Sequence, residues 1–236
     1  MIRGSLVVTL CATGALCVAL PAAESPAAPP TTPATHGPRP GTGPCPTAAP
    51  APPVPPATAK PSVVAAAPSA VLACIHTTPI YGATFTHWLG IARGDRRKAS
   101  GRLPPATTTD ADAAMQFLIS AEWIIGEAAH DHLAVTANEV RSAYRAALHA
   151  QFPGLKGFHA FLRSHGETIA DLKLRVRLTL LSAKLDARAE AAGPTPAKRK
   201  LALQAWISSF VARWKGETAC SAAYANPDCG GTLAKT

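Results

Sequence analysis

Apolar residues recur every three or four positions along most of the chain beyond residue 80, which is the spacing that predicts amphipathic helices. The segment 114–132, "AMQFLISAEWIIGEAAHDH", shows this most clearly, because its apolar residues fall within a stripe about 120° wide. The stripe consists of Ala114, Phe117, Leu118, Ala121, Ile124, Ile125, Ala128 and His132. Ile119 and Trp123 lie on the opposite side, so we expect the helix to be covered from two directions, by other helices or by a partner.

Capping signals place the boundaries of the next helices. Thr136 with Glu139, and Thr168 with Asp171, have the spacing of capping boxes, in which two side chains satisfy free backbone amides at a helix start. Between them, "FHAFLRSHG" predicts a short helix that stops at Gly166. The long helix that begins after Thr168 is predicted to pack on the main apolar stripe of the central helix.

A last helix is predicted from about Ala197 to Lys215, after the helix-breaking sequence "AAGPTP". Its apolar stripe consists of Leu203, Trp206, Ile207, Phe210, Val211 and Trp214. Full burial of each such side chain stabilises a fold by about 1.5–3 kcal/mol, so this stripe is too large to leave in water. We therefore predict that the last helix belongs to the same fold unit and lies on the Trp123 side of the central helix.

The start of the folded part has a different pattern. Val71 to Ile75 is predicted as a short β segment and Thr78-Pro79 as a turn, after which helical spacing begins. The patterns together predict an all-α, mainly helical domain over residues 69–236, with at most a short N-terminal β segment.

The region before this domain has a different composition. Sixteen of the 23 prolines lie between Pro21 and Pro68, so residues 24–68 are predicted to be a disordered Pro/Ala-rich linker. Residues 1–23 combine a basic residue with a short apolar run and then small residues, which is typical of a signal peptide. We therefore expect an exported protein, secreted or associated with the cell envelope, with a membrane anchor in residues 2–20 as the alternative.

Export would place the cysteines in an oxidising compartment. Cys220 and Cys229 flank an Asn-Pro-Asp turn and are predicted to form a disulfide. Cys45 and Cys74 have no obvious partners in the sequence. No paired C-x-x-C spacing is present, so a zinc site formed by cysteines is not expected.

The net charge of +9 narrows the possible partners. Basic residues cluster in "RGDRRK", "DLKLRVR" and "AKRK", but the chain contains no recognised nucleic-acid motif and export argues against nucleic acid as a partner. Outside the cytoplasm, the available anionic partners are cell-wall polymers, lipid head groups and acidic polypeptides. Alternatively, the clusters are simply solvated helix faces of a basic protein.

We find no signature of an active site. Glu127 and His130 have the i, i+3 spacing of di-iron helical bundles, but the second copy that such a site needs is missing. Glu127 also lies about 100° from the centre of the main apolar stripe, so we expect it to face solvent. No "GxSxG" motif is present. We therefore predict no catalytic residue, no metal and no cofactor.

The order of these motifs resembles that of a known group of proteins. A short strand with "TPI", a helix ending in "HWL", "AMQFLISAEWIIGEAAHDHLAVTANEV", "FHAFLRSHG" and "TIADLKLRVRLTLLSAKL" together resemble the N-terminal chaperone region of the SurA and PrsA group of exported bacterial foldases. The terminal "FVARWKGETAC" is similar to the closing helix of bacterial relatives in that group. The resemblance spans Ala70 to Cys229 and implies a SurA N-terminal-like helical chaperone domain.

The complete foldases of this group carry a parvulin-type prolyl isomerase domain between the long helix and the closing helix. In this chain only "DARAEAAGPTPAKRK" joins the two helices, which is too short for that domain, so no catalytic residue is carried over. The resemblance then implies a chaperone module without its isomerase.

The function expected on this basis is that of an ATP-independent chaperone that holds unfolded or nascent exported polypeptides. Trp88, Trp123, Phe158 and Phe161 are the candidate residues for contact with such clients, although each could equally be a core residue. Two alternatives remain. One is a peptidyl-prolyl isomerase, as the family resemblance suggests, and the other is a basic structural protein of the cell envelope.

Overall fold

The computed structural model describes residue 45 and residues 66–95 and 105–233. These residues form mostly helices, with one small sheet, so the mainly helical class predicted from the sequence is confirmed. The helices are α1 (Gly82–Asp95), α2 (Thr108–His130), α3 (Ala137–Gln151), α4 (Leu155–His165), α5 (Ile169–Glu190) and α6 (Pro196–Gly216). The strands are β1 (Val71–Ile75), β2 (Thr78–Tyr81), β3 (Thr218–Cys220) and β4 (Gly231–Thr232). The signal and most of the linker predicted before residue 69 lie outside the described residues.

The sheet joins the two ends of the described chain. Its strand order is β2-β1-β3-β4, with β1 antiparallel to both β2 and β3, and β3 parallel to β4. Ala73 pairs with Cys220 and Cys74 with Ala219. The prediction of at most an N-terminal β segment is therefore wrong at the C-terminal end. The strand β3 has only three residues, too few for an alternating pattern, and its extended conformation comes from pairing with β1.

The turn predicted at Thr78-Pro79 lies two residues earlier, at His76 and Thr77. His76 has a left-handed backbone conformation with φ of 52°, which reverses the chain, and Pro79 is part of β2. β2 is an edge strand of the sheet, where a residue without a backbone N–H is tolerated.

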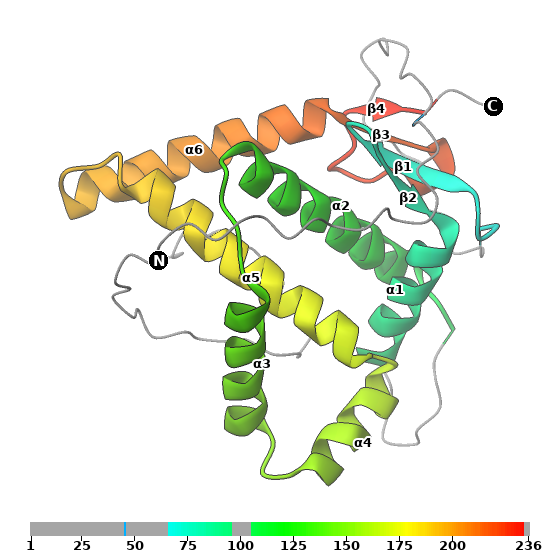
Figure 1. Ribbon diagram of the computed structural model, residues 1–236. Helices are drawn as coiled ribbons and strands as arrows, with labels where there is room; N and C mark the ends of the chain where they lie inside the picture. The colour runs from blue at the N-terminus through cyan, green and yellow to red at the C-terminus, as the bar shows by residue number, and fades with distance from the viewer. Residues whose placement is uncertain (1–44, 46–65, 96–104, 234–236) are drawn as a thin grey trace.

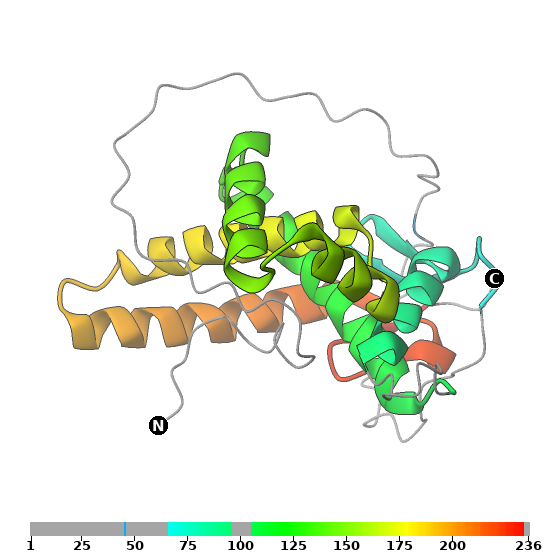
Figure 2. The ribbon, with the colours of Figure 1, turned by 90° about the horizontal axis from the view of Figure 1, so that it is seen from below.

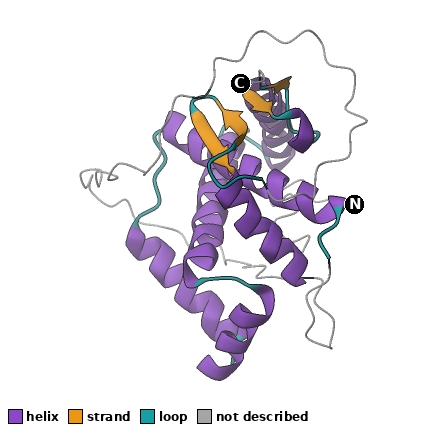
Figure 3. Cartoon of the chain, turned by 90° about the vertical axis from the view of Figure 1, so that its right-hand side faces the viewer, coloured by secondary structure: helices purple, strands orange, loops and turns teal. Residues whose placement is uncertain are grey.

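The sheet and the pair α3 and α4 lie at opposite ends of the molecule (Figure 1). In Figure 1 the strands are at the upper right, while α3 and α4 extend at the bottom, and Figure 3 also shows the strands gathered toward one end. Helices α5 and α6 meet at the turn that joins them and diverge from it (Figure 1), and α3 projects away from both of them (Figure 2).

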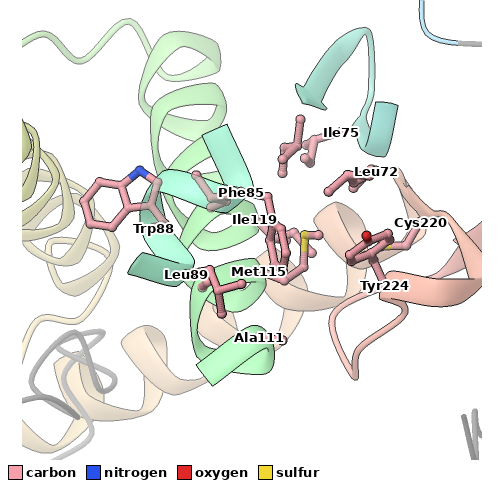
Figure 4. Close-up of a cluster of buried hydrophobic side chains, with 14 of the residues drawn as sticks. Leu72, Ile75, Phe85, Trp88, Leu89, Ala111, Met115, Ile119, Cys220 and Tyr224 are labelled. Carbon is pink, nitrogen blue, oxygen red and sulfur yellow. The ribbon is translucent and has the colours of Figure 1, made fainter. Parts of the chain in front are cut away.

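The larger core lies where the sheet meets α1 and the first half of α2 (Figure 4). Its largest fully buried side chains include Phe85, Met115 and Ile119, and the ring of Tyr224 contacts Phe85 edge-on at 5.2 Å. A second core joins α2 to α5. It consists of Ala121, Ile124, Ala128, Leu178, Leu181 and Leu185. The predicted packing of the main stripe of α2 against the long helix α5 is therefore confirmed.

Helix α6 covers the other side of α2, as predicted for the last helix. The Trp123 ring meets Phe210 edge-on at 6.1 Å, and Trp206 stacks on Phe210 at 5.2 Å. The Trp123 Nε1–H donates a hydrogen bond of 2.8 Å to Thr218 Oγ1 at the start of β3. These contacts join α2, α6 and β3 in one packed unit.

The expectation that Glu127 faces solvent is wrong. Its side chain is 3% exposed, and its Oε2 accepts hydrogen bonds from the Arg213 guanidinium and, at 2.7 Å, from Trp214 Nε1. Glu127 follows Trp123 by four residues and therefore lies on the same side of α2, which α6 covers. His130, by contrast, is exposed as expected.

Two disulfides connect the described cysteines. Cys220 and Cys229 are bonded as predicted, with Cα atoms 5.8 Å apart. Cys45 and Cys74, for which the sequence offers no obvious partner, are also bonded, with Cα atoms 6.0 Å apart. Disulfides of this kind persist in oxidising compartments, so both bridges favour an exported protein.

The close packing of α6 on α2 gives a direct test at Gly126. A Cβ atom placed there would lie 2.1 Å from Cη2 of the Trp214 ring, which the hydrogen bond to Glu127 holds in place. We expect Gly126→Ala to lower the free energy of unfolding by about 1–2 kcal/mol, measured by denaturant titration. Gly90→Ala is the matched control, because a Cβ at Gly90 meets nothing within 4 Å. It should stabilise α1 by about 0.5–1 kcal/mol, and equal effects of the two substitutions would contradict the α2–α6 packing.

The disulfide pairing has its own test. Peptide mapping of exported protein without reduction should recover Cys45 linked to Cys74 and Cys220 linked to Cys229. The double substitution Cys220→Ala with Cys229→Ala removes the disulfide that closes the shorter loop. It should destabilise the fold by about 2.7 kcal/mol in the chain-entropy description of a crosslink. Free thiols at any of the four positions in exported material would show that packing alone holds that contact.

Candidate functional site

The polar clusters of the helical body serve the fold. Within residues 45, 66–95 and 105–233, no three His, Cys, Asp or Glu side chains are grouped so that they could hold a metal ion. Among the helices of the same residues, none is long and apolar enough to span a membrane. The remaining polar contacts bridge neighbouring helices or cap their ends.

One of these contacts joins α1 to the start of α5. His87 Nε2 lies 2.9 Å from Asp171 Oδ1, and the other Asp171 oxygen accepts from the Thr168 amide and hydroxyl in the predicted capping box. Burial alone would raise the pKa of Asp171, but the hydrogen bonds from Thr168 and His87 outweigh it and lower the pKa below 3.8. The pair therefore fixes the position of α5 against α1.

Arg175 on α5 occupies a second inter-helix contact. Its guanidinium carbon lies 5.1 Å from the ring centroid of Trp88 and 5.0 Å from that of Phe117, and its Nη2 lies 3.1 Å from Glu167 Oε1. The Trp88 and Phe117 rings are 3.9 Å apart. A cation between aromatic faces and a buried carboxylate is a stable interior arrangement. The contact with Arg175 explains why Trp88 is a core residue.

The part of the molecule that differs from this body is the pair α3 and α4, residues Ala137–His165, which we call the α3–α4 arm. Its helix α3 begins at the capping box of Thr136 and Glu139, as predicted. Helix α4 ends at Gly166, whose φ of 70° gives the left-handed cap predicted for that glycine.

Aromatic rings hold the two helices of the arm together. Phe158 lies under the rings of Tyr144 and Phe152, at 6.4 and 5.4 Å between centroids. Phe161 contacts Phe152 at 5.3 Å and His165 at 4.3 Å. These contacts bury Phe158 but leave Phe161 only half-buried.

The apolar side of α4 is incompletely covered. Leu155, Phe158 and Leu162 follow each other at i, i+3 and i+7 and so share one side of the helix. Leu155 is 65% exposed and Leu162 is half-buried, while Phe158 is the only residue of α4 that is fully buried. An amphipathic helix with an open apolar side is a surface that another polypeptide chain can cover.

Contacts at its two ends attach the arm to the body. Lys184 on α5 donates hydrogen bonds of 2.7 Å to both Glu139 Oε1 and the Ala134 carbonyl. At the other end, α1 approaches so closely that a Cβ on Gly94 would lie 2.3 Å from the His165 carbonyl oxygen. The arm is therefore fixed to the body at both ends.

The four candidate client-contact residues are distributed unevenly. Trp88, Trp123 and Phe158 are each at most 4% exposed and belong to the interior. Phe161 is the only one of the four that is half-buried. The sequence pattern does not reveal Leu155, the most exposed large apolar residue of the arm, because it predicts a helix only from Phe158, whereas α4 begins at Leu155.

No protein-family model, curated protein or solved structure matches this chain.

The contact between His87 and Asp171 predicts how acid affects stability. Because the pKa of Asp171 is lowered by folding, its ionised form contributes stability that is present above 3.8 and lost as the pH falls through the folded-state value. We expect Asp171→Asn to be less stable than wild type at pH 7 and to lose less of its stability between pH 7 and acid, followed by denaturant titration. Burial raises the pKa of Asp112, so Asp112→Asn should instead make the loss in acid steeper. If the free energy of unfolding fell equally with pH in wild type, Asp171→Asn and Asp112→Asn, the directions given for the two pKa shifts would be wrong.

Proposed function

We propose that this protein is an exported, ATP-independent holdase that binds unfolded or partly folded polypeptides on its α3–α4 arm. The observation that carries the proposal is the open apolar side of α4, where 65% of Leu155 is exposed beside the half-buried Leu162 and Phe161. Chaperones of this kind bind clients through exposed apolar surface that a stable core does not use. The SurA N-terminal-like character suggested by the sequence motifs is part of this proposal.

The compartment fits this function. Both disulfides favour an oxidising environment, and a holdase acts there by binding alone, without nucleotide. Prolyl isomerisation is the weaker alternative, because α5 and α6 are separated only by residues 191–195, which leave no room for a catalytic domain between these helices.

The test is suppression of aggregation in the absence of nucleotide. A denatured client is diluted into buffer with increasing amounts of the full chain, and light scattering gives the amount of protein that halves aggregation. We expect Leu155→Gln to raise that amount about fivefold, because it removes roughly 1 kcal/mol of apolar contact with the client.

Leu201→Gln is the matched control. Leu201 is 64% exposed on α6, close to the value for Leu155, but it lies outside the arm. Both substitutions should leave the melting temperature unchanged, because neither side chain is buried. Absence of suppression by the wild-type chain, or equal loss in both variants, would contradict binding at the arm. Catalysis of a proline-limited refolding reaction at enzyme-like rates would favour the isomerase instead.

A further inference from the structure

The charge of the α3–α4 arm is strongly one-sided. Residues 140–166 contain no aspartate or glutamate, and they carry four Lys or Arg side chains and three histidines. The cations are Arg141, Arg145, Lys156 and Arg163. The two nearest carboxylates in sequence, Glu139 and Glu167, border this stretch on either side.

The basic side chains, histidines included, form one stripe on each helix of the arm. Arg141, Arg145 and His149 follow each other at intervals of four on α3, and Lys156, His159 and Arg163 lie within about 60° of each other on α4. All six residues are exposed. On α4 the cationic stripe runs alongside the apolar side that contains Leu155 and Leu162.

Glu139, in the first turn of the arm, and Glu167, just beyond its end, do not neutralise this charge. Glu139 pairs with Lys184 of α5, at 2.7 Å, and Glu167 pairs with Arg175 of α5, at 3.1 Å. Partial burial opposes ionisation of Glu139, but its bonds to Lys184 and Thr136 lower its pKa below 4.5, so it is engaged as an anion with a different cation. In the part of the chain that the structure describes, none of the ion pairs involves Arg141, Arg145, Lys156 or Arg163.

Several cations of the body form ion pairs with carboxylates. Arg175, Lys184, Arg188 and Arg213 each pair with a carboxylate of a neighbouring helix or loop. On the arm, all four Lys and Arg side chains lack a carboxylate partner within the described part of the chain, and on α4 two of them lie beside the open apolar side. Lys198 and Lys200, next to the exposed Leu201 on α6, also lack an ion pair among the described residues, so α6 offers a matched comparison for the arm.

We propose that the arm selects acidic segments of unfolded polypeptides, which rests on the holdase function proposed above. The apolar side chains of the client cover Leu155, Leu162 and Phe161, and its carboxylates lie along the basic stripes of α3 and α4. A polypeptide fits better than a purely anionic polymer, because only a polypeptide supplies apolar groups and carboxylates together along one extended chain. Each exposed charge pair adds modest affinity that salt screens, so the selectivity is salt-dependent.

The experiment measures binding of two labelled peptides to the full, oxidised chain by fluorescence anisotropy. The peptides have the same length and the same apolar residues, and one carries Asp and Glu where the other carries Asn and Gln. We expect the acidic peptide to bind about tenfold more tightly at low salt, and this preference to vanish near 1 M salt.

Variants assign the preference to the arm. Lys156→Gln with Arg163→Gln should weaken binding of the acidic peptide about fivefold and leave the neutral peptide unaffected. The matched control is Lys198→Gln with Lys200→Gln, which removes the same charge from exposed positions of α6 and should change neither peptide. Equal losses in both double variants would show that net charge acts rather than the arm, and would overturn the proposal.

The other outcomes separate this inference from the proposed function. Equal binding of the two peptides to wild-type protein overturns the selectivity and leaves the holdase function standing. No binding of either peptide, together with no suppression of aggregation, overturns the holdase function itself. Binding to phosphatidylglycerol vesicles that needs Lys156 and Arg163, without binding of the acidic peptide, would assign the arm to an anionic envelope surface and overturn the polypeptide as its occupant.

Discussion

The buried carboxylate of Glu127 determines where the last helix can sit. Two donors from α6, Arg213 and Trp214, both bond to Glu127 Oε2. An ionised carboxylate buried without donors is strongly unfavourable, so any shift of α6 along α2 that lost these bonds would cost several kcal/mol. The same register places Thr218 under the Trp123 indole and sets β3 beside β1. One polar contact thereby aligns a helix pair, a strand pair and the core between them.

The arm is attached by weaker interactions than the body. Lys184 and Glu139 form an ion pair in which both side chains are more than a third exposed, and pairs of this kind contribute little to stability. The arm's own aromatic cluster buries one residue of α4 fully, whereas the body buries large apolar side chains from β1, β2, α1, α2, α5 and α6. Local opening therefore costs least at the arm, which is where a surface that adapts to varied chains is most useful.

Local physics made much of this structure predictable from sequence. The capping boxes at Thr136 and Thr168 and the left-handed Gly166 depend only on residues three or four positions apart, and the structure has all three as predicted. The two-sided pattern of the central helix also gave the correct neighbours, because apolar periodicity reports directly on which faces are covered.

Features that depend on distant partners were missed. The position of Glu127 around the helix axis points to solvent when it is compared only with the main apolar stripe. Trp123, one turn earlier, lies on the second covered side of α2, and Glu127 lies on that side as well. The bond of Cys45 to Cys74 spans 29 positions across a region without periodic pattern. Of the candidate site, Phe161 was predicted and the open apolar side around Leu155 was not, since exposure depends on how far α1 and α3 cover α4.

The two disulfides end on neighbouring strands, which sets the mechanical path through the molecule. Cys74 lies on β1 and Cys220 on β3, where they are one register step apart across the sheet. Tension applied from the N-terminal side enters through Cys45 at Cys74, and tension from the C-terminal side enters through Cys229 at Cys220. The load then passes between β1 and β3 and bypasses the helices. Pulling on the oxidised chain therefore strains a few backbone hydrogen bonds between these strands, and the α3–α4 arm carries no load.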